Sequence, residues 1–136
     1  MTLFVDTSVW SLAFRRDTPV ETPQTSLLAK ALDAGETVVT TGLVLQELLQ
    51  GFEGARNRRA LLERFADLPF LEPAREDYIK AADLKSRCRK GGVQIGTIDA
   101  LLAQLCLRHE MSMLTADKDF IAIAKLSPLQ LAIAKA

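Results

Sequence analysis

The first strand of the chain places the strongest constraint on its fold. Residues 3–5 form a short apolar run that suits a strand buried on both faces of a parallel sheet. Asp6 follows at the point where this strand should end. Ligand sites of open parallel sheets lie outside the carboxyl ends of their strands. The sequence therefore predicts a functional carboxylate at that edge, with Thr7 or Ser8 capping a helix over residues 8–15.

The composition is that of an ordinary globular protein. The chain has 136 residues, 49% of them apolar, and we expect one domain over residues 1–136. Its 17 basic and 17 acidic side chains cancel, so any contact with nucleic acid must use a local basic patch. No apolar stretch approaches the roughly 18 residues of a membrane span, and the start lacks the pattern of a signal peptide. These features favour a soluble, cytoplasmic protein.

Strand and helix patterns alternate along the chain. Strands are predicted over residues 3–5, 37–41, 70–71, 112–115 and 129–133, the last of them at a sheet edge. Helices are predicted over residues 8–15, 24–33, 55–66, 76–90, 97–109 and 117–125, with one more beginning at Gly42. This order predicts a three-layer α/β/α domain with a central, mostly parallel sheet of four to five strands.

Two of the predicted helices should pack through apolar faces. For the helix over residues 76–90, the candidates for the buried face are Tyr78, Ile79, Ala82 and Leu84. Thr97 is the predicted cap of the next helix. Its apolar stripe is Ile98, Leu101, Leu102, Leu105 and Cys106.

Acidic residues occupy comparable places in this arrangement. Asp6 follows the first strand, Glu47 lies inside the helix after the second, and Asp99 lies in the first turn of a later helix. Asp117 follows the strand that ends near residue 115, and Asp119 is close to it. A parallel sheet brings its strand ends to one edge, so these acids can converge although they are distant in sequence. Taken singly, an acid in the first turn of a helix is also explained by the helix dipole.

Clustered carboxylates repel one another, and a divalent cation relieves that repulsion. Oxygen ligands without histidine or cysteine favour Mg²⁺ or Mn²⁺ over Zn²⁺. Two such ions, about 4 Å apart, activate a water and stabilise the leaving oxygen of a phosphodiester. The pattern therefore points to metal-dependent hydrolysis that needs no nucleophilic side chain.

Four segments carry a resemblance to a known family. They are VDTSVW at residues 5–10, VLQELLQG at residues 44–51, GTIDALLA at residues 96–103 and LTADKDF at residues 114–120. In this order and spacing they resemble PIN domains, and among these the VapC toxins of bacterial VapBC toxin–antitoxin pairs. The resemblance covers nearly the whole chain.

The resemblance implies an endoribonuclease that depends on Mg²⁺ or Mn²⁺ and is inhibited by a cognate VapB-type antitoxin. The residues that match the acidic quartet of the family are Asp6, Glu47, Asp99 and Asp117, of which Asp6, Asp99 and Asp117 are the expected metal ligands together with Asp119. The supporting polar positions are Thr7, Ser8, Thr97 and Thr115. Family members are usually homodimers, and the antitoxin wraps the toxin with its C-terminal segment.

Basic residues near the acids are candidates for RNA binding. Lys85, Arg87, Arg89 and Lys90 form the densest cluster, and Arg15 follows Asp6 closely. A solvated helix face is the alternative explanation of that cluster. Trp10 and Phe14 should pack in the core, with exposure at a partner groove as the alternative.

Two other functions fit parts of the pattern. A metal-dependent phosphatase or DNA nuclease would also use clustered acids, but the aspartyl-nucleophile phosphatases need a second aspartate where Ser8 stands. A receiver-like module that binds Mg²⁺ without catalysis needs a lysine on a late strand, which Leu114 and Thr115 do not supply. The RNA target stays open, because such specificity depends on RNA shape and on single-stranded loops.

Overall fold

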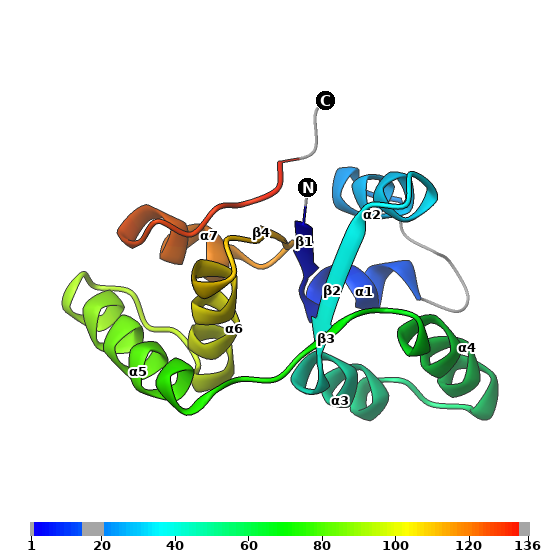
Figure 1. Cartoon of the computed structure of the whole chain (residues 1–136), viewed down its shortest axis with the longest axis horizontal. Coiled ribbons are helices and arrows are strands. Elements are labelled where there is room, and N and C mark those ends of the chain that lie inside the picture. The colour runs from blue at the N-terminus through cyan, green and yellow to red at the C-terminus, as the bar shows by residue number, and fades with distance from the viewer. Residues whose placement is uncertain (1, 15–20, 134–136) are drawn as a thin grey trace.

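Four parallel strands form the centre of the molecule (Figure 1). The computed structural model describes residues 2–14 and 21–133. Its strands are β1 (Thr2–Val5), β2 (Thr37–Thr41), β3 (Phe70–Leu71) and β4 (Ser112–Leu114). Its helices are α1 (Thr7–Ala13), α2 (Pro23–Asp33), α3 (Gly42–Gly51), α4 (Ala55–Ala66), α5 (Arg75–Lys90), α6 (Thr97–Arg108) and α7 (Lys118–Leu126).

Strand β1 lies inside the sheet, whose order is β3-β2-β1-β4. Phe4 is in register with Val39 of β2 on one side and with Met113 of β4 on the other. Residues 3–5 are fully buried, as the apolar run predicts. Because every described strand is parallel, the carboxyl ends of all four lie at the same edge, where Asp6 follows β1.

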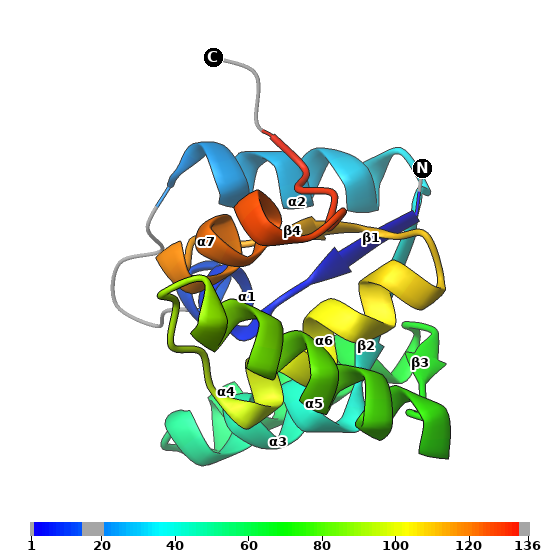
Figure 2. The same cartoon turned by 90° about the vertical axis from the view of Figure 1, so that its left-hand side faces the viewer.

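Helices cover the sheet on both sides. In Figure 1, α5, α6 and α7 lie to the left of the strands, α1, α2 and α4 lie to the right, and α3 lies below β3. Figure 2 shows α5 in front of α6, so α5 is the outer helix of its layer. The three-layer α/β/α prediction is therefore confirmed. None of the described helices combines the length and apolar character that crossing a membrane requires.

The predicted last strand over residues 129–133 is reduced to a single bridge. Met113 pairs with Leu131 in parallel orientation. The Met113 amide donates to the Gln130 carbonyl at 2.9 Å, and the Ala132 amide donates to the Met113 carbonyl at 2.8 Å. The segment therefore covers the outer edge of β4, but pairing through one residue does not make a fifth strand.

Helices α1 and α6 begin differently from the prediction. The cap of α1 is Asp6, whose side chain accepts from the Ser8 amide, so neither Thr7 nor Ser8 has this role. The cap of α6 is Gly96, which offers no side chain, and Thr97 is the first helical residue. In both cases the observed cap lies one or two residues before the hydroxyl residue expected to have this role. Residue 15, the predicted end of the first helix, lies outside the described part of the chain.

The buried face of α5 differs from the predicted one. It consists of Asp77, Ala81, Leu84 and Cys88. The prediction was right for Leu84 and wrong for Tyr78, Ile79 and Ala82, which are exposed. Ile98 at the start of α6 is also exposed, whereas the rest of the predicted α6 stripe is buried. The error on α5 arose because apolar periodicity could not place a charged residue, Asp77, at the centre of the buried face.

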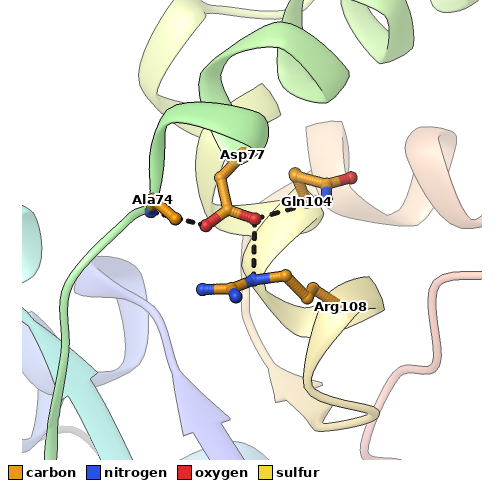
Figure 3. Close-up of polar contacts among 4 residues, drawn as sticks. All are labelled: Ala74, Asp77, Gln104 and Arg108. Atoms are coloured by element: carbon orange, nitrogen blue, oxygen red, sulfur yellow. Dashed lines mark hydrogen bonds and ion pairs between the residues drawn. The ribbon is translucent and has the colours of Figure 1, made fainter.

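Asp77 is buried because it finds three polar partners (Figure 3). One carboxylate oxygen accepts from the Ala74 amide at 2.8 Å, at the start of α5. The other receives Nε of Arg108 at 2.9 Å and the Gln104 side-chain amide at 3.5 Å, both from α6. A buried carboxylate is tolerated when it is paired and hydrogen-bonded. This network joins the start of α5 to the end of α6.

We predict that Asp77→Ala lowers the free energy of unfolding by roughly 2–3 kcal/mol, because it leaves buried donors without an acceptor. We expect a small loss for a broken buried ion pair, because the Arg108 side chain is 38% exposed and water can hydrate its guanidinium once the Asp77 carboxylate is removed. Urea unfolding at pH 7 measures the change. Asp83→Ala on the exposed side of α5 is the matched control and should change the stability by less than about 0.5 kcal/mol. Equal effects of the two variants would contradict this role of Asp77.

Candidate metal centre

Asp6 is fixed by hydrogen bonds at the carboxyl end of β1. Its side chain is only 3% exposed. One oxygen, Oδ1, accepts from the Ser8 amide at 3.1 Å and from the Ser8 hydroxyl at 2.6 Å. The other, Oδ2, accepts from the Thr115 hydroxyl at 2.8 Å. Both carboxylate oxygens are therefore oriented by the protein.

The same two hydroxyls bind the loop that follows β4. The Ala116 amide donates to the Ser8 hydroxyl at 2.9 Å, and the Asp117 amide donates to the Thr115 hydroxyl at 2.9 Å. Ser8 and Thr115 thus connect the carboxylate of Asp6 to the backbone that carries Asp117. The end of β1 and the start of α7 are held together although more than 100 residues separate them along the chain.

Three aspartates form the tightest group of acids. Asp99 lies in the first turn of α6, Asp117 is the cap of α7, and Asp119 lies in the first turn of α7. One carboxylate oxygen from each lies within 4.8 Å of those of the other two. Asp117 accepts from the Asp119 amide at 2.9 Å, which fixes the turn that carries both. Asp6 does not belong to this group of three.

Glu47 reaches the same region from α3. Its side chain is half-buried, and burial raises its pKa above the ordinary value. The charge of Asp6 raises the pKa further, and the neighbouring hydroxyl of Thr7 lowers it. That hydroxyl is buried and has no hydrogen bond of good geometry within the described residues. Glu47 therefore faces Asp6 and does not point away into solvent.

Electrostatics show that the acids converge. The pKa of Asp99 is raised to about 6, mainly by burial and then by the charges of Asp117, Asp119, Glu47 and Asp6, in that order. Burial also raises the pKa of Asp6, against the hydrogen bonds that favour its charged form, and the charge of Asp117 raises it further. Five carboxyl groups from four elements thus share one field of like charge.

The donor set of this cluster suits a hard divalent cation. The three grouped ligands are all carboxylate oxygens. His109, the only histidine, is the cap at the opposite end of α6 from Asp99. Both cysteines, Cys88 and Cys106, are buried. Oxygen ligands alone favour Mg²⁺ or Mn²⁺, and a bound cation would remove the repulsion that raises the pKa of Asp99.

The other predicted site residues fall into two sets. Thr7, Ser8 and Thr115 lie among the acids, whereas Thr97 is exposed and its hydroxyl makes no hydrogen bond within the described residues. The basic candidates on α5 are Lys85, Arg87, Arg89 and Lys90, at the end of the helix that precedes the loop to α6. Arg15 lies outside the described residues. Periodicity did not indicate that Ser8 and Thr115 would join two loops, because hydrogen bonds between distant segments leave no local pattern.

A separate groove lies between α1, α2 and α4. It has a volume of about 520 Å³, and its lining includes Trp10, Phe14, Leu28, Leu32, Arg64 and Asp67. Trp10 is 1% exposed and packs on Phe65 of α4, with ring centroids 4.9 Å apart. Its indole Nε1 is buried with no hydrogen-bond partner in the described structure. Trp10 is thus a core residue, as predicted, and it also lines the groove.

Comparisons with known proteins agree with the fold and with the motifs. A family model for the PIN domain matches residues 3–126. A search of curated proteins found no match. The chain is similar to the structure of VapBC2 from Rickettsia felis bound to a DNA fragment from its promoter, with TM-score 0.75 and 18% identity, covering 97% of this chain and 98% of that one.

Two further structures are similar over comparable lengths. VapBC-1 from nontypeable Haemophilus influenzae gives a TM-score of 0.73 at 18% identity, covering 97% of both chains. VapC20 from Mycobacterium tuberculosis, a toxin that cleaves the sarcin-ricin loop, gives a TM-score of 0.65 at 18% identity, covering 93% of this chain and 98% of that one. At such identities the likeness concerns the fold. Because the family model matches most of the sequence, the chain belongs to the PIN domain family.

Proposed function

We propose that this PIN domain is a VapC-type toxin, an endoribonuclease that requires Mg²⁺ or Mn²⁺ and is inhibited by a VapB-type antitoxin. The observation that carries the proposal is the convergence of five acids, with no nitrogen or sulfur ligand among them, at the carboxyl edge of a parallel sheet. Like charges brought together in this way destabilise a protein unless they bind a cation. Solved structures of VapBC complexes share the fold.

In this proposal the grouped aspartates hold the metal. Asp99, Asp117 and Asp119 would supply carboxylate oxygens, and the charge of Asp6 adds to the negative field around them. A bound divalent ion supplies an acidified water at neutral pH and positive charge for the phosphate oxygens. Ser8 and Thr115 act on Asp6 by donating to its two oxygens, which holds the carboxylate in one orientation. Glu47, with its raised pKa, accepts or holds a proton at its carboxylate oxygens beside Asp6.

RNA approaches this edge from the side of α5 in our proposal. The loop over residues 91–96 joins the basic end of α5 to α6 and ends beside Asp99, where a Cβ built on Gly96 would lie 3.8 Å from Oδ2. Positive side chains close to an acidic metal site offset its repulsion of phosphate. Which RNA is cleaved depends on its shape and its single-stranded loops.

The proposed partner is an antitoxin of the VapB type, and the chain itself would form a homodimer. The similar structures from Rickettsia felis and Haemophilus influenzae are VapBC assemblies. The groove between α1, α2 and α4 offers an apolar floor with Arg64 and Asp67 among its lining residues, which suits an amphipathic segment of a partner.

We predict that purified protein, free of antitoxin, cleaves total RNA into discrete fragments with Mg²⁺ or Mn²⁺ and that EDTA abolishes the cleavage. Asp6→Asn, Asp99→Asn and Asp117→Asn should each lower the rate roughly 10³-fold, because each removes an acid from the site that stabilises transition-state charge by several kcal/mol. Asp83→Asn on the exposed side of α5 is the matched control and should cleave at the wild-type rate.

DNA and small phosphate esters should be offered to the same preparations. Hydrolysis of those substrates without cleavage of RNA would contradict the ribonuclease proposal and indicate a DNA nuclease or a phosphatase. A folded wild type that binds Mg²⁺ and hydrolyses none of the three would contradict a catalytic function. Undiminished cleavage by Asp6→Asn would contradict the assignment of the site.

The stability of the metal-free protein should depend on the charge of Asp99. The pKa of Asp99 is raised to about 6, so the folded state binds more protons than the unfolded state between about pH 4 and pH 6. The free energy of unfolding should therefore fall as the pH rises through this window. Asp99→Asn should raise the free energy of unfolding by roughly 1 kcal/mol at pH 7.5 in EDTA, a value reduced from the full linkage energy because the residue is only half-buried.

Urea unfolding at pH 4 and pH 7.5 measures this effect, with Asp83→Asn as the control that should gain nothing. Saturating Mg²⁺ should raise the stability of the wild type and have less effect on Asp99→Asn, since metal binding stabilises the state that binds it. If Asp99→Asn is less stable than the wild type in EDTA at pH 7.5, the charged carboxylate of Asp99 does not destabilise the metal-free fold, and the prediction is wrong.

A further inference from the structure

A line of side chains along α5 has a composition that neither the metal site nor the fold explains. Arg75, Tyr78, Ala82, Lys85 and Arg89 follow one another at spacings of three, four, three and four residues. Residues so spaced lie on one face of a helix. Lys85 is half-buried, and the other four are exposed. We call this face the α5 stripe, and Figures 1 and 2 show that α5 is the outer helix of its layer.

The α5 stripe is positive and contains no acid. Of the three acids of α5, Asp77 is buried against α6, and Glu76 and Asp83 lie on the other exposed flank. Within the described residues no ion pair reaches Arg75, Lys85 or Arg89. Among the described residues, their side chains make one hydrogen bond, of 3.5 Å, from Arg89 to the Ser86 hydroxyl. Three cations are therefore available to an anionic partner.

Tyr78 gives the α5 stripe an aromatic surface. Its side chain is 55% exposed. The ring contacts between aromatic side chains in the described structure join Trp10, Phe14, Phe52 and Phe65 and do not include Tyr78. The neighbouring Ala82 is small, so one side of the ring is open along the helix. A base can stack on such a ring.

We infer that the α5 stripe binds single-stranded RNA, with Arg75, Lys85 and Arg89 on phosphates along the strand and Tyr78 against a base. The inference rests on the proposed ribonuclease function and adds to it the path of the substrate strand. Arg75 and Arg89 are 14 residues apart, which corresponds to about 21 Å along the helix, enough for several nucleotides. Alternating cations and an aromatic are the usual composition of a surface for single strands.

The C-terminal end of the α5 stripe points the strand toward the acids. Helix α5 ends against the C-terminal end of α7, because a Cβ built on Gly91 would lie 2.9 Å from the Leu126 side chain. Asp117 caps the opposite end of α7, and the loop after Gly91 leads to α6, which carries Asp99 in its first turn. A strand bound along the stripe would therefore leave it near the elements that carry the metal ligands.

Charge favours RNA over a second copy of this chain on the α5 stripe. In a symmetric interface the same surface meets itself. Two antiparallel copies of α5 would place Arg75 of one against Arg89 of the other, and like charges facing each other are unfavourable. A polyanion meets no such repulsion. Arg87 and Lys90 lie about 100° or more around the helix from Lys85 and Arg89, respectively, so they do not belong to the stripe.

The test compares two double variants with the same loss of charge. Lys85→Gln with Arg89→Gln changes the α5 stripe, and Arg87→Gln with Lys90→Gln changes the opposite flank of the same helix. Binding of a fluorescein-labelled, single-stranded 12-mer RNA is followed by anisotropy in EDTA between 50 and 200 mM salt. The stripe variant should bind about tenfold more weakly and lose about 1.4 from the slope of log K against log salt concentration, because two phosphate contacts disappear. The flank variant loses the same charge near the site but no contact of the stripe, so it should lose clearly less affinity than the stripe variant and keep a steeper salt dependence.

Tyr78→Ala should also weaken binding about tenfold, whereas Tyr78→Phe, which keeps the ring, should bind normally. Equal losses in the stripe and flank variants, or normal binding by the stripe variant, would overturn the inference. A change of oligomeric state in the stripe variant with unchanged RNA affinity would show that the face binds a second copy instead.

Cleavage with Mg²⁺, measured beside binding, separates this inference from the proposed function. RNA cleavage that is unaffected by the stripe variant overturns the inference alone. Binding of RNA that depends on the stripe, without cleavage by the wild type, overturns the ribonuclease proposal and leaves the stripe as an RNA site. A wild type that neither binds nor cleaves RNA overturns both.

Discussion

The hydrogen bonds to Asp6 hold the functional edge of this molecule together. A carboxylate that is 3% exposed would be unfavourable without donors, and Ser8 and Thr115 supply them to both of its oxygens. The same hydroxyls accept from the backbone that leads to Asp117. Two distant segments thereby form one rigid base for the acids. The carboxylates can stay close together despite their mutual repulsion, because hydrogen bonds fix the end of β1 to the loop that carries Asp117.

Parallel pairing makes this arrangement possible. β1 is flanked by β2 and β4, so the segments that follow all three strands start at one edge. Helices α1, α3 and α7 begin there because each follows a strand. Helix α6 precedes β4 in the chain and carries Asp99 in its first turn. The Asp77 network joins the far ends of α5 and α6 and so fixes the helix that carries Asp99. Packing on one side of the sheet thus sets the position of a ligand at its edge.

Much of this could be predicted from the sequence, because strand ends and apolar runs leave local patterns. The run before Asp6 and the short strand before Asp117 placed both acids at the same edge, and the structure brings them together with Glu47, Asp99 and Asp119. The order of helices and strands was recovered for the same reason.

What failed depended on contacts between distant residues. Tyr78 and Ile79 were predicted to be buried because Asp77 was not expected at the centre of the inner face, and its partners Gln104 and Arg108 lie on another helix. The segment around Leu131 has the composition of a strand, but it pairs through a single bridge. Two of the residues wrongly predicted to be buried, Tyr78 and Ala82, belong to the α5 stripe.

The most direct measurement of the central claim is the anomalous scattering of a crystal grown with Mn²⁺. We expect an anomalous difference peak in contact with the carboxylates of Asp99, Asp117 and Asp119, beside the oriented carboxylate of Asp6. This peak should be lost in Asp117→Asn. Crystals that contain Mn²⁺ elsewhere but show no peak among these aspartates, or a peak that persists unchanged in Asp117→Asn, would contradict a metal centre at this edge of the sheet.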